Sequence, residues 1–404
     1  MTLVPIGRRR TPTLPIPRTG LVAWWQRRRE GRELDLTSRY LSGQWAATVD
    51  GANLVHRTST AAGIPHTSIP RLRSIREGPP LVLVVEMLPG QVIADFQSQA
   101  HRIAEGMGVA MVRVTPHRNG WITVTLLIRD PLSHPMPLPH RRPDTPATAP
   151  VLLGADEYGR PVTINFGERV HLIVQGRTGS GKSRLSYAIL QQLAAAPEAV
   201  IAGSDPSSVL LRPFAGSRHA RWQVLGGDPH RHVELLEQLV AEMDTRLASI
   251  PQRVDELPLT AAAAMVFVVL EEWLALLGLA AGDKRLRDRL TIAARRLAAE
   301  GGKVGIRVIM LPQRAEANEL GGGLLRGQFA YRLTLPVDNV DAVRLLHPTV
   351  PTPQAEAHVS TGLPGIALYD APGQQHGRLR TPWMPDYGAY WDAIKSLTTT
   401  AEER

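Results

Sequence analysis

A glycine-rich stretch that ends in lysine and serine is the part of this sequence whose residue types and spacing most clearly indicate a chemical function. It fits the pattern G-x-x-x-x-G-K-[ST], follows the apolar stretch Arg169–Val174 and precedes the helical stretch Lys182–Ala195. Its residues are Gly176, Arg177, Thr178, Gly179, Ser180, Gly181, Lys182 and Ser183. Glycines allow backbone N–H groups to converge on phosphate oxygens at the start of a helix. In such a loop Lys182 binds the β- and γ-phosphates of ATP and Ser183 is a ligand of Mg²⁺, so the sequence predicts a nucleotide-binding loop.

Hydrolysis also needs acidic groups near this loop, and two adjacent glutamates meet that need. The continuous apolar run Met265–Leu270 predicts a buried strand, and Glu271 and Glu272 follow at its carboxyl end. Ligands of α/β sheets bind at that end of the strands. We assign Glu271 to the Mg²⁺ site and Glu272 to the positioning of the attacking water. In the alternative interpretation both glutamates only begin the next helix, because glutamate favours a first helical turn.

Gln313 is a candidate sensor residue. It comes just after the predicted strand Val304–Leu311, so its amide is expected at the same edge of the sheet as the phosphate-binding loop. There it would contact the γ-phosphate or the attacking water. The alternative is an ordinary glutamine in a loop.

The order of predicted elements from residue 151 onward defines the fold class. Strands and helices alternate, which is typical of a parallel sheet with crossover helices. Strands are expected at 169–174, 200–202, 265–270, 303–311 and 330–335, and helices at 182–195, 232–250 and 286–299. The separation between Lys182 and Glu271 leaves room for an extra strand between their two strands. We therefore predict an α/β protein with a P-loop NTPase core of the additional-strand, RecA-like class.

A smaller α/β domain is expected ahead of this core. Strands are predicted at 81–87, 109–115 and 121–128, with a turn at Asn119-Gly120 and a helix at 92–107. A segment with seven prolines in twenty residues follows, and it is expected to be a linker. The predicted division of the chain is a basic Arg/Pro-rich region at 1–79, the small domain at 80–130, the linker at 131–150, the ATPase domain at 151–395 and a tail at 396–404.

Composition restricts the partners and the compartment. The 404 residues include no cysteine, which excludes disulfides and thiolate metal sites and fits a reducing cytoplasm. The net charge of +9 favours a polyanionic partner, and the excess is concentrated in residues 1–40. No run reaches the ~18 apolar residues of a membrane span, so we expect a cytoplasmic protein. It could still be peripheral at a membrane through Leu21–Arg29, where two tryptophans adjoin three arginines; a short helix packed on the body and a solvated basic tail are the alternatives.

Several motifs in order resemble the FtsK/SpoIIIE family of DNA translocases, including the TraB-like transfer proteins of conjugative elements. The resemblance covers residues 80 to 345. Besides the phosphate-binding loop, the similar motifs are Leu153–Asp156 with Gly159–Val162, Ser204-Asp205-Pro206, Glu242–Arg246, Glu271-Glu272-Trp273 and Pro312-Gln313-Arg314. The chain departs from the family pattern at Glu271, where the family has aspartate, and at Pro312, which removes a backbone donor ahead of Gln313.

The resemblance implies a ring, hexameric in the family, that moves DNA through its centre with each nucleotide site completed by an arginine of a neighbour. Arg332 is the first candidate for that arginine and Arg326 the second. DNA, double-stranded in our expectation, would be contacted through its phosphates. Lys284, Arg285, Arg287 and Arg289 are candidates for these contacts, and a solvated helix face is the alternative.

Three functions are compatible with these residues. The first is an ATP-driven DNA translocase for conjugative or mobile-element transfer. The second is a nucleotide-dependent coupling or adaptor protein that docks a DNA complex onto a membrane machine, with the N-terminal region as a possible contact. The third is a chromosome-partition motor.

Overall fold

The computed structural model describes residues 4–5, 34–59, 63–76, 78, 80–259, 263–315 and 323–398. The predicted Trp/Arg segment Leu21–Arg29 and the end of the expected C-terminal tail lie outside these residues. The chain forms two compact units, Met1–His134 and Pro135–Arg404.

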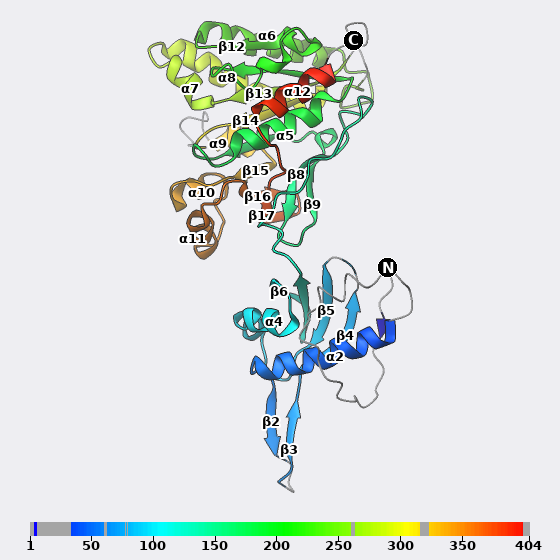
Figure 1. Ribbon diagram of the computed structural model, residues 1–404. Coiled ribbons are helices and arrows are strands. Elements are labelled where there is room, and N and C mark those ends of the chain that lie inside the picture. Colours follow the sequence, from blue (N-terminus) through cyan, green and yellow to red (C-terminus); the bar gives the residue numbers. More distant parts are fainter. Residues whose placement is uncertain are drawn as a thin grey trace. The chain divides into compact units, whose positions relative to one another are not determined.

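The first unit is built on an antiparallel sheet with the strand order β1-β4-β5-β7-β6; Figure 1 labels β4, β5 and β6. Its strands are β1 (Val4–Pro5), β4 (Arg71–Arg76), β5 (Leu81–Glu86), β6 (Met111–Arg118) and β7 (Trp121–Leu127). Its helices are α2 (Leu34–Gly51), α3 (Ile93–Ser98) and α4 (Ala100–Met107). A hairpin of β2 (His56–Ser59) and β3 (Pro65–Ser68), exposed on nearly all its residues, extends from this unit (Figure 1).

The small domain begins earlier in the chain than residue 80. Leu41 and Trp45 of α2 and Ile75 of β4 are buried in the same core as the predicted strands and helix. The indole N–H of Trp45 also donates a hydrogen bond to the carbonyl of Pro70, at 2.9 Å. The predicted helix 92–107 is divided at Gln99, which separates α3 from α4. The region up to residue 79 was described by its arginine and proline content, but α2 itself contains one arginine and no proline.

The second unit contains a ten-stranded sheet with the order β12-β11-β13-β14-β10-β15-β16-β17-β8-β9. Its strands are β8 (Val151–Asp156), β9 (Pro161–Ile164), β10 (Leu172–Gln175), β11 (Ala199–Asp205), β12 (Gln223–Leu225), β13 (Met265–Glu271), β14 (Ile306–Leu311), β15 (Tyr331–Thr334), β16 (Ile366–Ala371) and β17 (Gln374–Arg380). Strands β12 to β15 of this order pair in parallel, and β16, β17, β8 and β9 continue the sheet with antiparallel pairs.

The strand that separates the two motif strands in the sheet is β14, which follows Glu271 in the chain and so does not come from the stretch between Lys182 and Glu271. Strand β14 pairs with β10 on one side and with β13 on the other, so it lies between the strand that leads into the phosphate-binding loop and the strand that carries Glu271. The structure therefore has the sheet of an additional-strand P-loop core.

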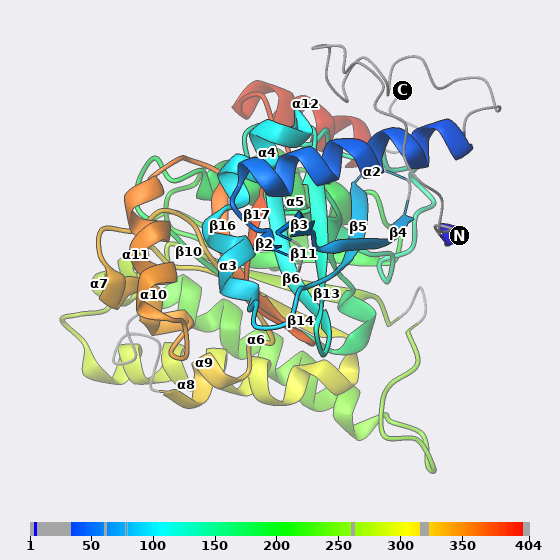
Figure 2. The same ribbon diagram turned by 90° about the horizontal axis from the view of Figure 1, so that it is seen from below.

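Helices cover both faces of this sheet, which explains why its central strands are apolar without alternation. The helices are α5 (Lys182–Ala194), α6 (Pro229–Ala248), α7 (Trp273–Leu279), α8 (Lys284–Glu300), α9 (Gly323–Gly327), α10 (Val340–Leu346), α11 (Thr352–Thr361) and α12 (Tyr387–Thr398). Helices α5 and α12 share one core with alternate residues of β13, whereas α6 and α8 pack against the other face (Figure 2). None of the described helices is long and apolar enough to cross a bilayer.

The boundaries of this unit differ from the predicted ones. The unit begins at Pro135, and Ala147 is buried in its core, so most of the expected linker 131–150 packs against the ATPase domain. At the other end, α12 continues to Thr398, three residues beyond the expected boundary at 395. Proline-rich composition indicated a linker, but prolines also suit an extended segment that packs along a core without pairing in a sheet.

Candidate nucleotide-binding site

The predicted phosphate-binding loop lies between β10 and α5, at the carboxyl end of the parallel strands. Its glycines are required by its geometry. Gly179 and Gly181 have φ angles of 78° and 97°, which residues other than glycine rarely adopt. A Cβ on Gly176 would lie 2.5 Å from the Oγ of Ser180. The loop can therefore turn tightly and direct its backbone N–H groups toward a bound anion.

Lys182 is the central charged residue of the site. Lys182 is only 9% exposed. Its Nζ donates hydrogen bonds to Oε1 of Glu272 and to the carbonyl of Leu311, both at 3.0 Å. The other carboxylate oxygen of Glu272 accepts a hydrogen bond from Nε2 of Gln313, at 3.0 Å. The structure thus brings Lys182, Glu272 and Gln313 together from three different elements.

The backbone of Glu272 explains how its side chain reaches Lys182. Glu272 has a left-handed conformation, with φ 43° and ψ 52°, which is uncommon for a residue with a side chain and is typical of functional sites. It precedes α7, but its side chain makes no capping hydrogen bond to that helix. The carboxylate instead accepts hydrogen bonds from Lys182 and Gln313. This favours a role of Glu272 in the nucleotide site over the alternative that it only begins a helix.

Glu271 lies in a cavity of about 210 Å³ that Lys182 and Ser183 also line. Burial, followed by the negative charges of Asp205 and Glu272, raises the pKa of Glu271 to about 8. Its Oε2 is buried and has no hydrogen-bond partner in the described structure. An unsatisfied buried carboxylate oxygen beside a serine hydroxyl is an oxygen-rich environment that fits Mg²⁺, so Ser183 and Glu271 could hold that ion.

The prediction of the site from the sequence missed Asp205, although the motif Ser204-Asp205-Pro206 was noticed. Asp205 ends β11, the neighbour of β13, and is fully buried. Its carboxylate accepts hydrogen bonds from the backbone N–H of Leu211, at 2.9 Å, and from the hydroxyl of Ser207, at 2.7 Å. Its partner Ser207 lines the cavity, and the charge of Asp205 contributes to the raised pKa of Glu271.

Gln175, directly before the phosphate-binding loop, was also missed. Its Nε2 donates to Oγ1 of Thr334, at 2.8 Å, and to the carbonyl of Ala342, at 2.7 Å. Its Oε1 accepts from the backbone N–H of Ala315, at 3.0 Å. This buried amide connects the base of the loop to β15, to α10 and to the segment after Gln313. A single glutamine after an apolar run gives no sequence signal for such a role.

The two candidate arginines lie apart from the group around Lys182. Arg332 of β15 is paired at the level of Ile173, before the carboxyl end of β10, and donates to the carbonyls of Phe329, at 2.9 Å, and Leu346, at 3.3 Å. Arg326 donates to the carbonyl of Leu345, at 2.6 Å. Both guanidinium groups therefore stabilise the chain around α10 in this structure.

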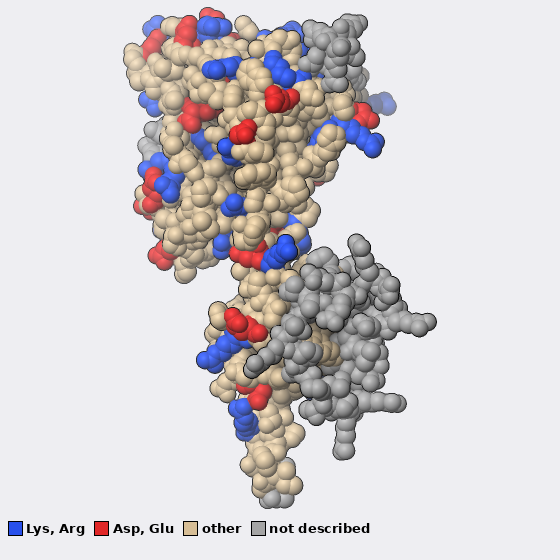
Figure 3. Space-filling view, viewed as in Figure 1, with Lys and Arg blue, Asp and Glu red and all other residues tan. Residues whose placement is uncertain are grey.

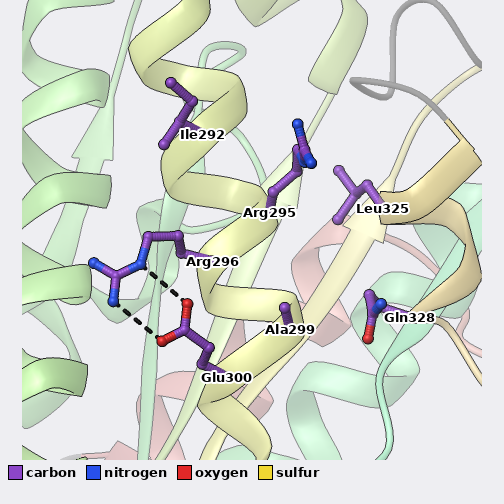
Figure 4. A pocket seen from close by; sticks show the side chains of 7 residues that line it. All are labelled: Ile292, Arg295, Arg296, Ala299, Glu300, Leu325 and Gln328. Atoms are coloured by element: carbon purple, nitrogen blue, oxygen red, sulfur yellow. Dashed lines mark hydrogen bonds and ion pairs between the residues drawn. The ribbon is translucent and has the colours of Figure 1, made fainter.

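Another cavity lies between α8 and α9 (Figure 4). Its volume is about 420 Å³, and Ile292, Arg295 and Leu325 are among its lining residues. Arg296 at its edge is paired with Glu300 (Figure 4). No residue of the phosphate-binding loop lines it, so it is not part of the nucleotide site.

Comparison with known proteins shows which sequences this chain resembles. Residues 139–256 match the model of the FtsK/SpoIIIE family. The chain is 26% identical over 204 residues to the DNA translocase FtsK of Treponema pallidum, which covers 47% of this chain and 25% of that protein. It is 37% identical over 97 residues to the DNA translocase FtsK of Staphylococcus aureus, which covers 23% of this chain and 12% of that protein. The chain thus spans only a minor part of these relatives, and within that part the resemblance predicted from the sequence is confirmed.

Solved structures show the same fold. The pCW3 conjugation coupling protein TcpA, in its monomer form with ATPgS, aligns with a TM-score of 0.52 at 17% identity, covering 88% of this chain and 99% of that chain. The cytoplasmic domain of the Type VII secretion ATPase EccC from Thermomonospora curvata aligns with a TM-score of 0.50 at 17% identity, covering 67% and 33%. The predicted P-loop fold is confirmed.

We predict that Lys182→Ala reduces the affinity for a fluorescent ATP analogue by at least about tenfold, because the loop loses the ammonium that binds the terminal phosphates. Equilibrium fluorescence titration measures this. Lys284→Ala is the matched control, because Lys284 is an exposed lysine at the start of α8 and should leave the affinity unchanged. Equal affinities of all three proteins would contradict the assignment of the site.

Proposed function

Because residues 139–256 match the FtsK/SpoIIIE family, we propose that this protein is an ATPase that converts ATP and water to ADP and phosphate and uses the reaction to move DNA. One observation carries the proposal. Lys182, Glu272 and Gln313 converge on one edge of a P-loop sheet, beside the cavity that contains Glu271 and Ser183.

Each of these side chains has a role in the proposed hydrolysis. Lys182 exchanges its bonds to Glu272 and Leu311 for the β- and γ-phosphates, where its charge stabilises the transition state. That exchange frees a carboxylate oxygen of Glu272 to orient the attacking water. Gln313 contacts the γ-phosphate or that water. Ser183 and Glu271 would hold Mg²⁺, which neutralises charge on the phosphates when bound.

Substitutions of the two glutamates should separate these roles. We predict that Glu272→Gln binds ATP and hydrolyses it at least about a hundredfold more slowly, because an amide orients water poorly. Glu271→Gln should instead raise the Mg²⁺ concentration needed for half-maximal hydrolysis. Steady-state hydrolysis as a function of Mg²⁺, together with nucleotide titration, measures both effects. Glu271→Asp is the control that keeps the charge, and exchanged phenotypes would show that the two roles are assigned in the wrong order.

DNA is proposed as the partner on the basis of the relatives and of charge. The FtsK relatives are named DNA translocases, and TcpA is named a conjugation coupling protein. Lys284, Arg285 and Arg287 of α8 are exposed and form no ion pair with the described residues, whereas Arg289 is paired with Glu237 at 2.7 Å. Basic and acidic side chains are interspersed over the face of the second unit seen in Figure 3. The exposed group on α8 is therefore the proposed phosphate contact, with transfer of conjugative or mobile-element DNA at the cytoplasmic side of a membrane as the proposed setting.

Hydrolysis with and without DNA tests this function. We predict that duplex DNA stimulates ATP hydrolysis and that the stimulation falls steeply between about 50 and 200 mM salt, since phosphate contacts release counterions. Combined replacement of Lys284, Arg285 and Arg287 by alanine should weaken the stimulation and flatten its salt dependence. Arg289→Ala, on the same helix, is the matched control.

Single-stranded DNA is the comparison that identifies the substrate. Stronger stimulation by single strands would replace duplex DNA in the proposal. ATP hydrolysis that no DNA affects would refute a translocase and support a coupling or adaptor protein instead.

The proposed assembly is a ring, hexameric by analogy with the family, in which Arg332 of one subunit acts at the site of the next. In that assembly Arg332 would exchange its bonds to Phe329 and Leu346 for the γ-phosphate. A trans-acting arginine contributes about 10³–10⁵ to the rate. We predict that Arg332→Ala and Lys182→Ala are each inactive alone and that mixing them restores part of the activity, because some interfaces combine an intact loop with an intact arginine. Hydrolysis assays of mixtures measure this, and a total lack of complementation would show that Arg332 only stabilises its own chain.

A further inference from the structure

The phosphate-binding loop contacts a part of the chain that none of the roles above uses. Gly365, in the loop between α11 and β16, donates its backbone N–H to the carbonyl of Ser180, at 2.8 Å. A Cβ on Gly181 would lie 2.9 Å from the backbone nitrogen of Gly365. The segment Gly362–Gly365 therefore lies directly against the phosphate-binding loop, with no side chain between the two backbones at that point.

A second segment, Thr381–Met384, is attached to the same place. The backbone N–H of Thr381 donates to the carbonyl of Gly365, at 2.8 Å. Arg184, in the first turn of α5, donates from Nη1 to the carbonyl of Met384, at 3.3 Å. These two hydrogen bonds place the segment after β17 beside the beginning of the helix that follows the phosphate-binding loop.

Each of these segments carries a large apolar side chain that is exposed. Leu363 is 54% exposed and Trp383 is 57% exposed. A single exposed apolar residue needs no explanation. Here, however, both belong to segments that are hydrogen-bonded to the phosphate-binding loop or to the helix that it begins. Binding sites for organic ligands combine apolar and aromatic contacts with a few polar groups.

The sheet order shows on which side of the loop these two segments lie relative to the side chains around Lys182. On the side of β14 and β13, the loop is closed by Lys182, Glu272 and Gln313. On the opposite side β10 pairs with β15, and β16 and β17 follow. Gly362–Gly365 precedes β16 and Thr381–Met384 follows β17, so both lie on the side that is not used for the terminal phosphates.

We propose that Gly362–Gly365 and Thr381–Met384 form the binding edge for the base of the nucleotide, with Leu363 and Trp383 as its apolar contacts. The ligand class is a planar aromatic base, which an indole ring and a leucine side chain bind by stacking and apolar burial. This inference rests on the proposed ATPase function. In this proposal the two segments bind the base, and the phosphate-binding loop binds the phosphates.

Comparison of ATP with inorganic tripolyphosphate tests the base edge, because tripolyphosphate has the phosphates and no base. We expect the double variant Leu363→Ser, Trp383→Ala to bind ATP about tenfold or more weakly, since it loses the burial of two apolar side chains. Its affinity for tripolyphosphate should equal that of the unsubstituted protein. Competition against a fluorescent ATP analogue and titration calorimetry measure both affinities, and the single variants apportion the loss.

Ile292→Ser is the matched control, because Ile292 is 55% exposed on α8 and should leave both affinities unchanged. An unchanged ratio of the two affinities in the double variant would overturn the base edge. Equal weakening of ATP and tripolyphosphate would also overturn it, because the substitutions would then act through the phosphate-binding loop. Failure of the unsubstituted protein to bind either ligand is a different result, which refutes the proposed function itself.

Discussion

The arrangement of this site depends on the need to compensate a buried ammonium group. Lys182 is almost entirely enclosed, and an isolated charge in that position would be strongly unfavourable. Glu272 and the carbonyl of Leu311 supply the compensation, and Gln313 fixes the second oxygen of Glu272. Removing one partner of a buried ion pair destabilises the folded protein much more than removing one partner of an exposed pair. The ends of β13 and β14 and the start of α5 must therefore stay in register around this one nitrogen atom.

In the proposed hydrolysis, the same constraint connects nucleotide binding to catalysis. Phosphate oxygens can replace Glu272 and Leu311 as the partners of Lys182, so the ammonium remains compensated while the carboxylate becomes available. Glu271, one residue earlier, lies in the adjacent cavity with an unsatisfied oxygen and a raised pKa. The side chains of two consecutive residues at the end of one strand thus lie in different parts of the site, Glu271 in the cavity and Glu272 against Lys182, because the left-handed conformation of Glu272 redirects its side chain. The segments around Gly365 and Thr381 add a contact on the opposite side of the loop.

The sequence predicted those parts of the structure whose chemistry is local. The phosphate-binding loop, the two glutamates, Gln313 and the alternation of strands and helices follow from short motifs and local apolar patterns. Other parts depend on contacts between distant segments. Gln175 bonds to Thr334 and Ala342, and Gly365 bonds to Ser180, and no local pattern indicates these pairs. The start of the small domain was misplaced for the same reason, because Trp45 and Ile75 reach their core only through sheet pairing and helix packing. Arg332 was selected by its place in the chain, and its bonds to Phe329 and Leu346 could not be seen there.

The most direct test of this account is an experimental structure of the protein with a non-hydrolysable ATP analogue and Mg²⁺. The account predicts Nζ of Lys182 within about 2.7–3.2 Å of a β- or γ-phosphate oxygen and no longer bonded to Glu272. It also predicts Mg²⁺ between Ser183 and Glu271, with the base against Leu363 and Trp383. A nucleotide bound elsewhere, or a Lys182 that keeps its bond to Glu272 beside a bound nucleotide, would contradict it.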